Sequence, residues 1–291
     1  MKTEIKKIKF FSSYCSQEQI TKNIISSWGK GSNTYKDLQI TSDDDYEYAI
    51  LLNNGRPDRT ITKENVIGFS HEPRMTLGLN EERIEYIYNN VSEYYISNNK
   101  DLPENFISGF TFVCPSEFGE SEFKKYGHEN KMSMILSMSN FMPGHNMRHI
   151  LLRKILESDL DIHFYAEGLN KIYNDPRVKE FGWDIFSKPY EEYEFQIVIE
   201  NIIDDSWATE KLTNCIIKET TPIYYGSKKI AECFYPKDSI VFLDNNIDSN
   251  FEKIANCYHS GKSDCDITQR AKKILYDDMN LLEYLHKKIN G

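Results

Sequence analysis

The chain has 291 residues, of which 40% are hydrophobic and 13% aromatic, and its formal net charge is −10. This length and composition predict one large or two ordinary packed domains and exclude a disordered chain. The acidic balance argues against a nucleic-acid partner, which is usually bound through a basic face, but it leaves room for a local basic pocket.

Membrane and targeting segments are not expected. The sequence has no run of 18 apolar residues, and its first residues, MKTEIKKIKFFSSY, lack the apolar centre of a secretory signal. Six cysteines are scattered without a CxxC pair, which favours reduced thiols. These features predict a soluble, cytoplasmic protein without a signal peptide or membrane anchor.

The first half of the chain alternates between strand and helix patterns. Ser16 and Gln19 form a capping box that starts a helix, and a second helix is expected around residues 80–88. Apolar runs predict strands at residues 8–11, 46–52, 65–69, 93–96 and 110–113. This alternation predicts an α/β domain. We place it at residues 1–128, because the polar run 126–131 separates it from the second half of the chain.

The second half repeats the alternation and predicts another α/β domain, residues 129–291. Strands are expected at residues 132–136, 161–165, 195–199, 223–225 and 240–243. One helix follows the first of these strands, another begins near Ala208, and the tail 267–289 is predicted to be a terminal helix of this domain. Two similar halves predict a ligand site in the cleft between them.

The stretch 195–226 is the clearest strand–helix–strand unit in the chain. Its first strand ends in Glu200-Asn201, and its helix begins near Glu210-Lys211, with Trp207 in the loop between them. In open α/β sheets, ligands bind at the carboxyl ends of the strands, where these side chains gather. Lys211 could meet a phosphate, and Glu210 could accept hydrogen bonds from sugar hydroxyls. Ordinary surface positions are the alternative.

Arg148 lies in the opening turn of a helix that follows a strand. Helix N-termini favour anions, and a guanidinium supplies two parallel donors to a phosphate. A solvated surface arginine is the alternative from position alone. If the neighbouring strands are ordered as expected, Arg148 shares a sheet edge with Asn201 and Lys211.

Glu72 ends a strand of the first domain and precedes a proline, which favours an extended backbone. A carboxylate that points into the cleft could act as a general base. His71 should face the opposite side of an extended chain and is the weaker candidate. A polar strand end without catalytic function is the alternative for Glu72.

Metal-binding patterns are weak. Asp43-Asp44-Asp45 and Asp159-Leu160-Asp161 are similar to the acidic motif of metal-dependent sugar transferases, but each precedes a strand and so lies at the wrong edge of a sheet. Cys257, His259 and Cys265 lack zinc-module spacing. We expect no metal site in the chain.

The motifs of the second half resemble those of the α1,3-fucosyltransferase family. The resemblance rests on Glu200-Asn201, an aromatic residue at 207, Thr209-Glu210-Lys211-Leu212, and Pro222-Ile223-Tyr224-Tyr225-Gly226. Phe234, Pro236, Ile240 and Asp244 continue it, and Ser139-Asn140 with Arg148 precede it. The end of the strand at Glu72 is similar to that family's acidic base. Together these positions extend over about residues 65–250.

The resemblance implies a GT-B fold, in which two Rossmann-like domains face each other across a cleft. It implies an inverting enzyme that transfers fucose from GDP-fucose to a glycan hydroxyl, without a tightly bound cofactor or required metal. Arg148 and Lys211 would neutralise the diphosphate. Asn201, Trp207 and Glu210 would hold the ribose and sugar, and Glu72 would be the catalytic base.

Three departures from the family pattern leave the donor open. Trp207 stands where a tyrosine is usual, Ile202 where a serine follows the Glu-Asn pair, and Ala166 where a glycine follows a strand. One alternative is the same fold with another GDP- or UDP-sugar. A second is a catalytically degenerate glycan-binding protein. The acceptor and the oligomeric state are not encoded in any motif.

Overall fold

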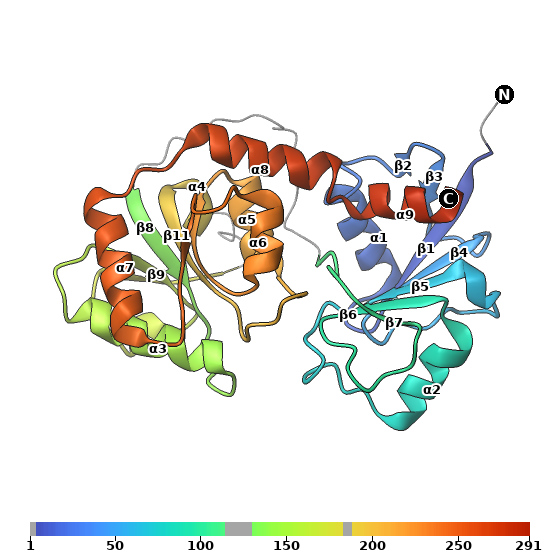
Figure 1. Cartoon of the computed structure of the whole chain (residues 1–291), viewed down its shortest axis with the longest axis horizontal. Coiled ribbons are helices and arrows are strands. Elements are labelled where there is room, and N and C mark those ends of the chain that lie inside the picture. The colour runs from blue at the N-terminus through green and yellow to red at the C-terminus, as the bar shows by residue number, and fades with distance from the viewer. Residues whose placement is uncertain (1–3, 114–129, 183–187) are drawn as a thin grey trace. The chain divides into compact units, whose positions relative to one another are not determined.

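The computed structural model describes residues 4–113, 130–182 and 188–291 of the chain (Figure 1). Its contacts divide the chain into two compact units. The first contains Met1–Glu122, Asp204–Thr209 and Tyr276–Gly291, and the second contains Phe123–Ile203 and Glu210–Leu275. The predicted domain boundary, 128/129, lies outside the described residues.

The described part of the first unit contains a seven-stranded sheet with the order β2-β3-β1-β4-β5-β6-β7. The strands are β1 (Lys6–Ser12), β2 (Thr34–Tyr35), β3 (Leu38–Ile40), β4 (Tyr48–Leu52), β5 (Val66–Phe69), β6 (Glu93–Ile96) and β7 (Phe106–Ser108). All neighbours are parallel except β2 and β3. α1 (Gln17–Ser26) and α2 (Glu81–Asn90) lie on opposite faces (Figure 1). The sheet is therefore covered on both sides, as parallel sheets require.

Local sequence signals in this unit form the expected structure. Ser16 caps α1 by accepting a hydrogen bond from the Gln19 amide, as the capping box predicts. Asn80 caps α2 in the same way through the Arg83 amide. The strand expected at 110–113 is wrong: those residues are irregular, and the edge strand is β7 instead. Their aromatic side chains pack against other rings, which explains the apolar run without a ladder.

The second unit holds a parallel sheet with the order β10-β9-β8-β11-β12-β13 among its described residues. The strands are β8 (Asn130–Ile135), β9 (His163–Tyr165), β10 (Val178–Lys179), β11 (Tyr193–Ile199), β12 (Thr221–Tyr225) and β13 (Val241–Phe242). The helices are α3 (Pro143–Leu156), α4 (Lys188–Glu191), α5 (Glu210–Ile217), α6 (Lys228–Phe234), α7 (Ile247–Ser260) and α8 (Cys265–Asp277). From β8 the chain adds β9 and β10 on one side, and it then returns to add β11, β12 and β13 on the other side of β8. This is the strand order of nucleotide-binding doubly wound sheets, and the order reverses between β8 and β11.

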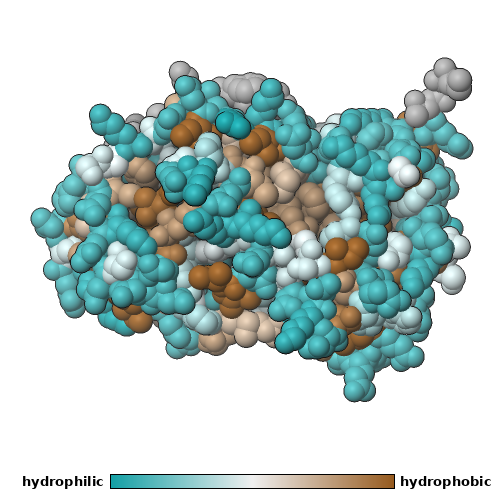
Figure 2. Space-filling view, viewed as in Figure 1, coloured by the Kyte–Doolittle hydropathy of each residue, from teal (hydrophilic) through white to brown (hydrophobic). Residues whose placement is uncertain are grey.

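The core of the second unit explains why these segments fold as they do. α3 and α7 pack on one face of the sheet, and α5 and α6 lie toward the other (Figure 1). Buried methionine, leucine and isoleucine side chains of β8, α3 and β11 fill the space between sheet and helix, among them Met134, Leu151 and Ile197. Polar side chains cover much of the visible surface of each unit (Figure 2). No helix among the described residues is long and apolar enough to cross a bilayer.

The tail of the chain differs from the expectation of one terminal helix in the second domain. The helix breaks at Asn280, whose side chain caps α9 (Leu281–Asn290). α9 contacts the first unit: Glu283 binds Tyr35 and Lys36, and His286 lies 2.6 Å from Asp37. The apolar stripe of α9 predicts a helix but cannot tell which sheet that helix covers.

Candidate functional site

The candidate site of the second unit lies where α3 meets the end of β11, at the reversal of the strand order. The Gly144 amide donates to the Asn201 carbonyl oxygen at 2.9 Å. A Cβ atom on Gly144 would lie 1.8 Å from the Glu200 carbonyl oxygen, so only glycine allows this approach. The backbone thereby holds the helix N-terminus against the strand end.

Arg148 is buried at this junction and is not a solvated surface arginine; only 4% of it is exposed. Its Nε donates to the Ile199 carbonyl oxygen at 3.0 Å, and its Nη2 donates to the same oxygen and to Asn201 Oδ1 at 2.7 Å. Burial lowers the pKa of Arg148, against the opposing effect of Glu200 and Glu210. The guanidinium is thus oriented by the end of β11.

Lys211 lies between two carboxylates at the start of α5. Its Nζ is 3.2 Å from Glu210 Oε1 and 3.8 Å from Glu200 Oε2. Burial acts to lower the pKa of Lys211, but Glu210 and Glu200 outweigh it, and the pKa is raised. Glu200 is fully buried, whereas 36% of the Glu210 side chain is exposed. Lys211 therefore stays charged beside Arg148.

His145 belongs to this site, although no motif of the sequence indicated it. It is the third residue of α3 and lies one helical turn before Arg148, on the same face. It is 5% exposed, and its ring meets the Phe141 ring edge-on at 4.8 Å. Burial, followed by the charges of Arg148 and Lys211, lowers the pKa of His145 to about 4. The imidazole is therefore neutral near pH 7. Its position three residues before Arg148 on the same helix is the feature of the sequence that could have indicated it.

Four of the predicted donor residues come together in the second unit: Arg148, Asn201, Glu210 and Lys211. We call these four, with Glu200 and His145, the anion clamp. Trp207 is placed differently, because the segment Asp204–Thr209 belongs to the first unit. It is 1% exposed, and its Nε1 donates to the His71 carbonyl oxygen at 3.4 Å.

Glu72 follows β5 at the carboxyl edge of the first unit's sheet. Asn53 Oδ1 accepts hydrogen bonds from the amides of His71, at 2.7 Å, and Glu72, at 3.2 Å, which fixes the backbone there. The Glu72 side chain is exposed, and Thr76 Oγ1 lies 3.4 Å from its carboxylate. His71 is buried, with Nδ1 3.2 Å from the Tyr14 hydroxyl. The two side chains thus face opposite ways, as their alternation predicts.

The acidic strings have partners that explain them. Asp44 and Asp45 pair with Lys9 and Lys7 of β1, so they neutralise strand lysines. Asp161 lies 3.6 Å from His163 at the start of β9. No group of three or more His, Cys, Asp or Glu side chains that could hold a metal ion occurs in residues 4–113, 130–182 and 188–291.

Comparison with known proteins finds a family match in the second half of the chain. Residues 128–258 match glycosyltransferase family 10 (fucosyltransferase), C-terminal part. A predicted fucosyltransferase of Acanthamoeba polyphaga mimivirus is 35% identical over 80 residues. That alignment covers 24% of this chain and 13% of the viral protein, so the chain spans a small part of its length.

Solved structures match over nearly the whole chain. An α1,3-fucosyltransferase with GDP has a TM-score of 0.55 and 14% identity, with 100% of this chain and 92% of that chain covered. Anabaena HepE in complex with UDP and glucose has a TM-score of 0.58 and 8% identity, with 99% and 100% covered. At these identities the similarity establishes the fold alone: two parallel-sheet α/β domains of the GT-B class, as the resemblance implied.

The matched segment contains the anion clamp. Arg148, Asn201, Glu210 and Lys211 all fall within residues 128–258, the range that the family covers. The resemblance drawn from the motifs of the sequence is therefore confirmed. Over residues 128–258 this chain is therefore similar to the C-terminal part of glycosyltransferase family 10, the fucosyltransferase family, and the match supports a glycosyltransferase enzyme.

Proposed function

We propose that the chain transfers a sugar, L-fucose from GDP-fucose, to a glycan hydroxyl with inversion at the anomeric carbon. The observation that carries this proposal is the anion clamp at the strand reversal of a sheet that matches family 10. Nucleotide phosphates bind at this position in doubly wound sheets. The α1,3-fucosyltransferase structures include complexes with GDP and with GDP-fucose.

Arg148 and Lys211 serve the leaving group in this proposal. Two Arg148 nitrogens are engaged by Ile199 and Asn201, and the described residues contain no hydrogen-bond partner for Nη1. We assign to the diphosphate oxygens this Nη1 and the charged Lys211 Nζ, which stays beside Glu210 and Glu200. Fixed cations stabilise charge that develops on a departing diphosphate, because they need no reorganisation during the reaction. The proposal therefore assigns no step to a metal ion.

Glu210, Asn201 and Trp207 have different roles around the donor. The partly exposed Glu210 carboxylate accepts hydrogen bonds from donor hydroxyls, and Asn201 orients Arg148. Trp207 is nearly fully buried, so it acts by anchoring the loop between β11 and α5 through its bond to His71. This division follows the exposure of each side chain.

Glu72 acts as the base in the proposed reaction. The acceptor oxygen forms a bond to the anomeric carbon, the bond from that carbon to the diphosphate breaks, and the hydroxyl proton passes to the Glu72 carboxylate. Support comes from its place after β5, where Asn53 fixes the backbone and leaves the carboxylate exposed. General-base assistance of this kind is worth about 10²–10⁴ in rate.

The experiment compares donor binding with turnover in two variants. Lys211→Ala should weaken GDP binding by roughly tenfold or more, since a charge-assisted contact is lost. Glu72→Gln should retain GDP affinity but lower kcat by about two orders of magnitude. Lys154→Ala and Glu82→Gln are the controls, because both residues form exposed ion pairs. Full activity of both test variants would refute the assigned roles.

Two alternatives have their own outcomes in the same experiment. Preference for UDP over GDP in calorimetry would indicate another donor, which the UDP complex of Anabaena HepE keeps open. Glycan binding without transfer or hydrolysis of any donor would indicate a degenerate glycan-binding protein. The mutually paired Arg148, Asn201, Glu210 and Lys211 argue against that second alternative.

A further inference from the structure

Two loops beside the anion clamp expose large apolar side chains. Met138 and Phe141 lie in the loop between β8 and α3, and they are 53% and 71% exposed. Ile203 follows β11 and is 46% exposed. Of the large apolar side chains that the described part of the second unit exposes, only Ile150 and Ile172 lie outside these two loops. We call Met138, Phe141 and Ile203 the apolar rim.

The apolar rim adjoins the clamp. The Gly144 amide donates to the Asn201 carbonyl oxygen at 2.9 Å, so the two loops meet at the clamp. Phe141 lies shortly before Gly144 in the chain, and Ile203 lies shortly after Asn201. The Phe141 ring also contacts the imidazole of His145, a clamp residue, with 4.8 Å between the ring centroids. A ligand that fills the clamp would therefore lie beside Phe141.

The Phe141 ring is exposed although its backbone is fixed on both sides. On the N-terminal side, the Ser139 carbonyl oxygen lies 3.1 Å from His149 Nε2. On the C-terminal side, Met142 is buried, and its carbonyl oxygen accepts a hydrogen bond from the Asn146 amide at 3.2 Å. A ring held in this way loses little conformational freedom when a ligand packs on it, so such a contact favours binding.

Charge and apolar surface together define the class of ligand. Arg148 and Lys211 supply positive charge for an anion, whereas the rim offers surface without charge. Single exposed apolar side chains are ordinary, but a group of them beside a few polar groups is typical of a ligand site. A diphosphate alone would leave the rim in water. A nucleotide sugar carries uncharged rings, the sugar and the nucleoside, on the two sides of its diphosphate.

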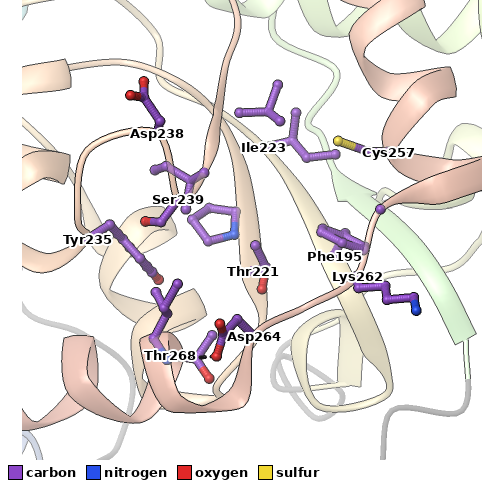
Figure 3. Close-up of a pocket in the computed structure, with 15 residues that line it drawn as sticks. Phe195, Thr221, Ile223, Tyr235, Asp238, Ser239, Cys257, Lys262, Asp264 and Thr268 are labelled. Atoms are coloured by element: carbon purple, nitrogen blue, oxygen red, sulfur yellow. Dashed lines mark hydrogen bonds between the residues drawn. The ribbon is translucent and has the colours of Figure 1, made fainter.

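A cavity of about 150 Å³ in the same unit does not adjoin the clamp (Figure 3). Its lining includes Thr221 at the start of β12, Cys257 of α7 and Thr268 of α8. The Glu200 amide donates to the Tyr225 carbonyl oxygen at 2.8 Å, which places the clamp at the other end of β12. Thr221 and Tyr225 are about 13 Å apart along an extended strand. The rim, and not this cavity, is therefore the apolar surface next to the clamp.

We propose that the Phe141 ring packs against an uncharged ring of the nucleotide sugar while the diphosphate lies in the anion clamp. Met138 and Ile203 border the same contact. The packed ring is the transferred sugar or the guanine base, since a pyranose presents C–H groups and a base presents an aromatic face to such a side chain. This inference rests on the proposed function, because it takes a diphosphate in the clamp as given. It adds a substrate contact outside the residues that the motifs indicated.

Calorimetry with pyrophosphate, GDP and GDP-fucose tests this contact in the full chain. Phe141→Ala should bind pyrophosphate as the parent protein does, because no clamp residue is changed. It should bind GDP-fucose roughly fivefold or more weakly, because apolar contact area is lost. An equal loss for GDP would identify the nucleoside as the packed ring, and unchanged GDP affinity would identify the sugar.

Phe141→Tyr and Ile150→Ala are the controls. Phe141→Tyr keeps the aromatic ring and should keep GDP-fucose affinity within about twofold. Ile150→Ala removes an apolar side chain that is 40% exposed on α3, and it should bind all three ligands as the parent does. The Tm of Phe141→Ala should stay close to that of the parent, because most of the ring is already in solvent.

Nuclear Overhauser effects in the GDP-fucose complex locate the packed ring directly. The ring protons of Phe141 should contact protons of fucose if calorimetry identifies the sugar, and protons of guanosine if it identifies the nucleoside. Contact with neither would overturn the inference.

Two calorimetric results would also overturn it. Equal GDP-fucose affinity in Phe141→Ala and the parent would mean that the ring makes no contact with the donor. Weakening of pyrophosphate by the same factor as GDP-fucose would mean that Phe141 acts on the clamp through His145. Both results leave the proposed function standing, because the parent binds the donor in each. A parent protein that did not bind GDP-fucose would instead refute the proposed function, and this inference with it.

Discussion

At the scale of single residues, His145 shows how charge neighbours determine a chemical state. An ordinary surface histidine is partly protonated near pH 6.5. Burial and the positive charges of Arg148 and Lys211 lower the pKa of His145 to about 4, so its imidazole is neutral at pH 6.5. An anion that enters the clamp offsets those cations, and this should raise the pKa of His145.

The first prediction is that GDP binding takes up a proton at pH 6. The free protein has His145 deprotonated at this pH, and the complex should hold it partly protonated, so binding tightens as the pH falls from 8 to 6. Calorimetry in two buffers of different ionisation enthalpy measures the uptake. The terminal phosphate of GDP also takes up a proton in this pH range. The relevant quantity is therefore the difference in proton uptake between the parent protein and His145→Gln.

The control for this prediction is His259→Gln, because His259 is exposed on α7. It should take up as many protons as the parent protein. Identical uptake in His145→Gln and the parent would show that His145 does not titrate with the ligand.

At the scale of elements, the contact between α3 and β11 depends on Gly144. An alanine there would place its Cβ 1.8 Å from the Glu200 carbonyl oxygen, so the helix end must move. We predict that Gly144→Ala loses about 1–3 kcal/mol of unfolding free energy. It should also weaken GDP binding at least tenfold, because Arg148 is oriented by Ile199 and Asn201.

The matched control is Asn146→Ala, an exposed position two residues further along α3. Urea unfolding and GDP calorimetry of the two variants give the comparison. Native affinity in Gly144→Ala would mean that the clamp tolerates movement of the helix.

A second prediction at this scale concerns how α8 is held. Lys272 of α8 and Glu219, in the turn after α5, are 2.9 Å apart, and their side chains are 3% and 4% exposed. Removal of one partner leaves the other charge buried, so Lys272→Met should destabilise the protein by about 3–5 kcal/mol. Lys272→Met with Glu219→Leu should recover much of that loss in urea unfolding. A double variant less stable than the single one would contradict this account.

At the scale of the whole molecule, α9 attaches the end of the chain to the first unit through Glu283. Burial by itself would raise the pKa of the Glu283 carboxyl group. Hydrogen bonds from Lys36, Tyr35 and Lys287 outweigh burial and lower this pKa from 4.5 to about 2. A carboxyl group whose pKa is lower in the folded state binds protons more tightly when unfolded. Its stabilisation is therefore complete above about pH 4.5 and is lost as the pH falls toward 2.

We predict that the opening free energy of α9, measured by hydrogen exchange, decreases between pH 4.5 and pH 2 by at most about 3 kcal/mol. Glu283→Gln should lose most of this stabilisation at pH 6 and show a flatter pH dependence. Glu252→Gln, at an exposed position on α7, should behave like the parent.

Much of the architecture follows from local patterns. The alternation of apolar runs and capping signals predicts most strands of both sheets, and the capping box at Ser16 forms as expected. The short strands β2, β3, β7 and β10 escape prediction, since two or three residues carry no periodicity. The strand expected at 110–113 does not form, because aromatic packing, and not a ladder, accounts for its apolar residues.

Residues close together in the chain are enough to predict the α/β class, the strand–helix–strand unit at 195–226 and the family motif. Folding alone settles that α9 covers the first sheet, that Trp207 anchors to His71, and that His145 is neutral. This difference arises because burial and Coulomb interaction depend on neighbours that folding brings together from distant parts of the chain.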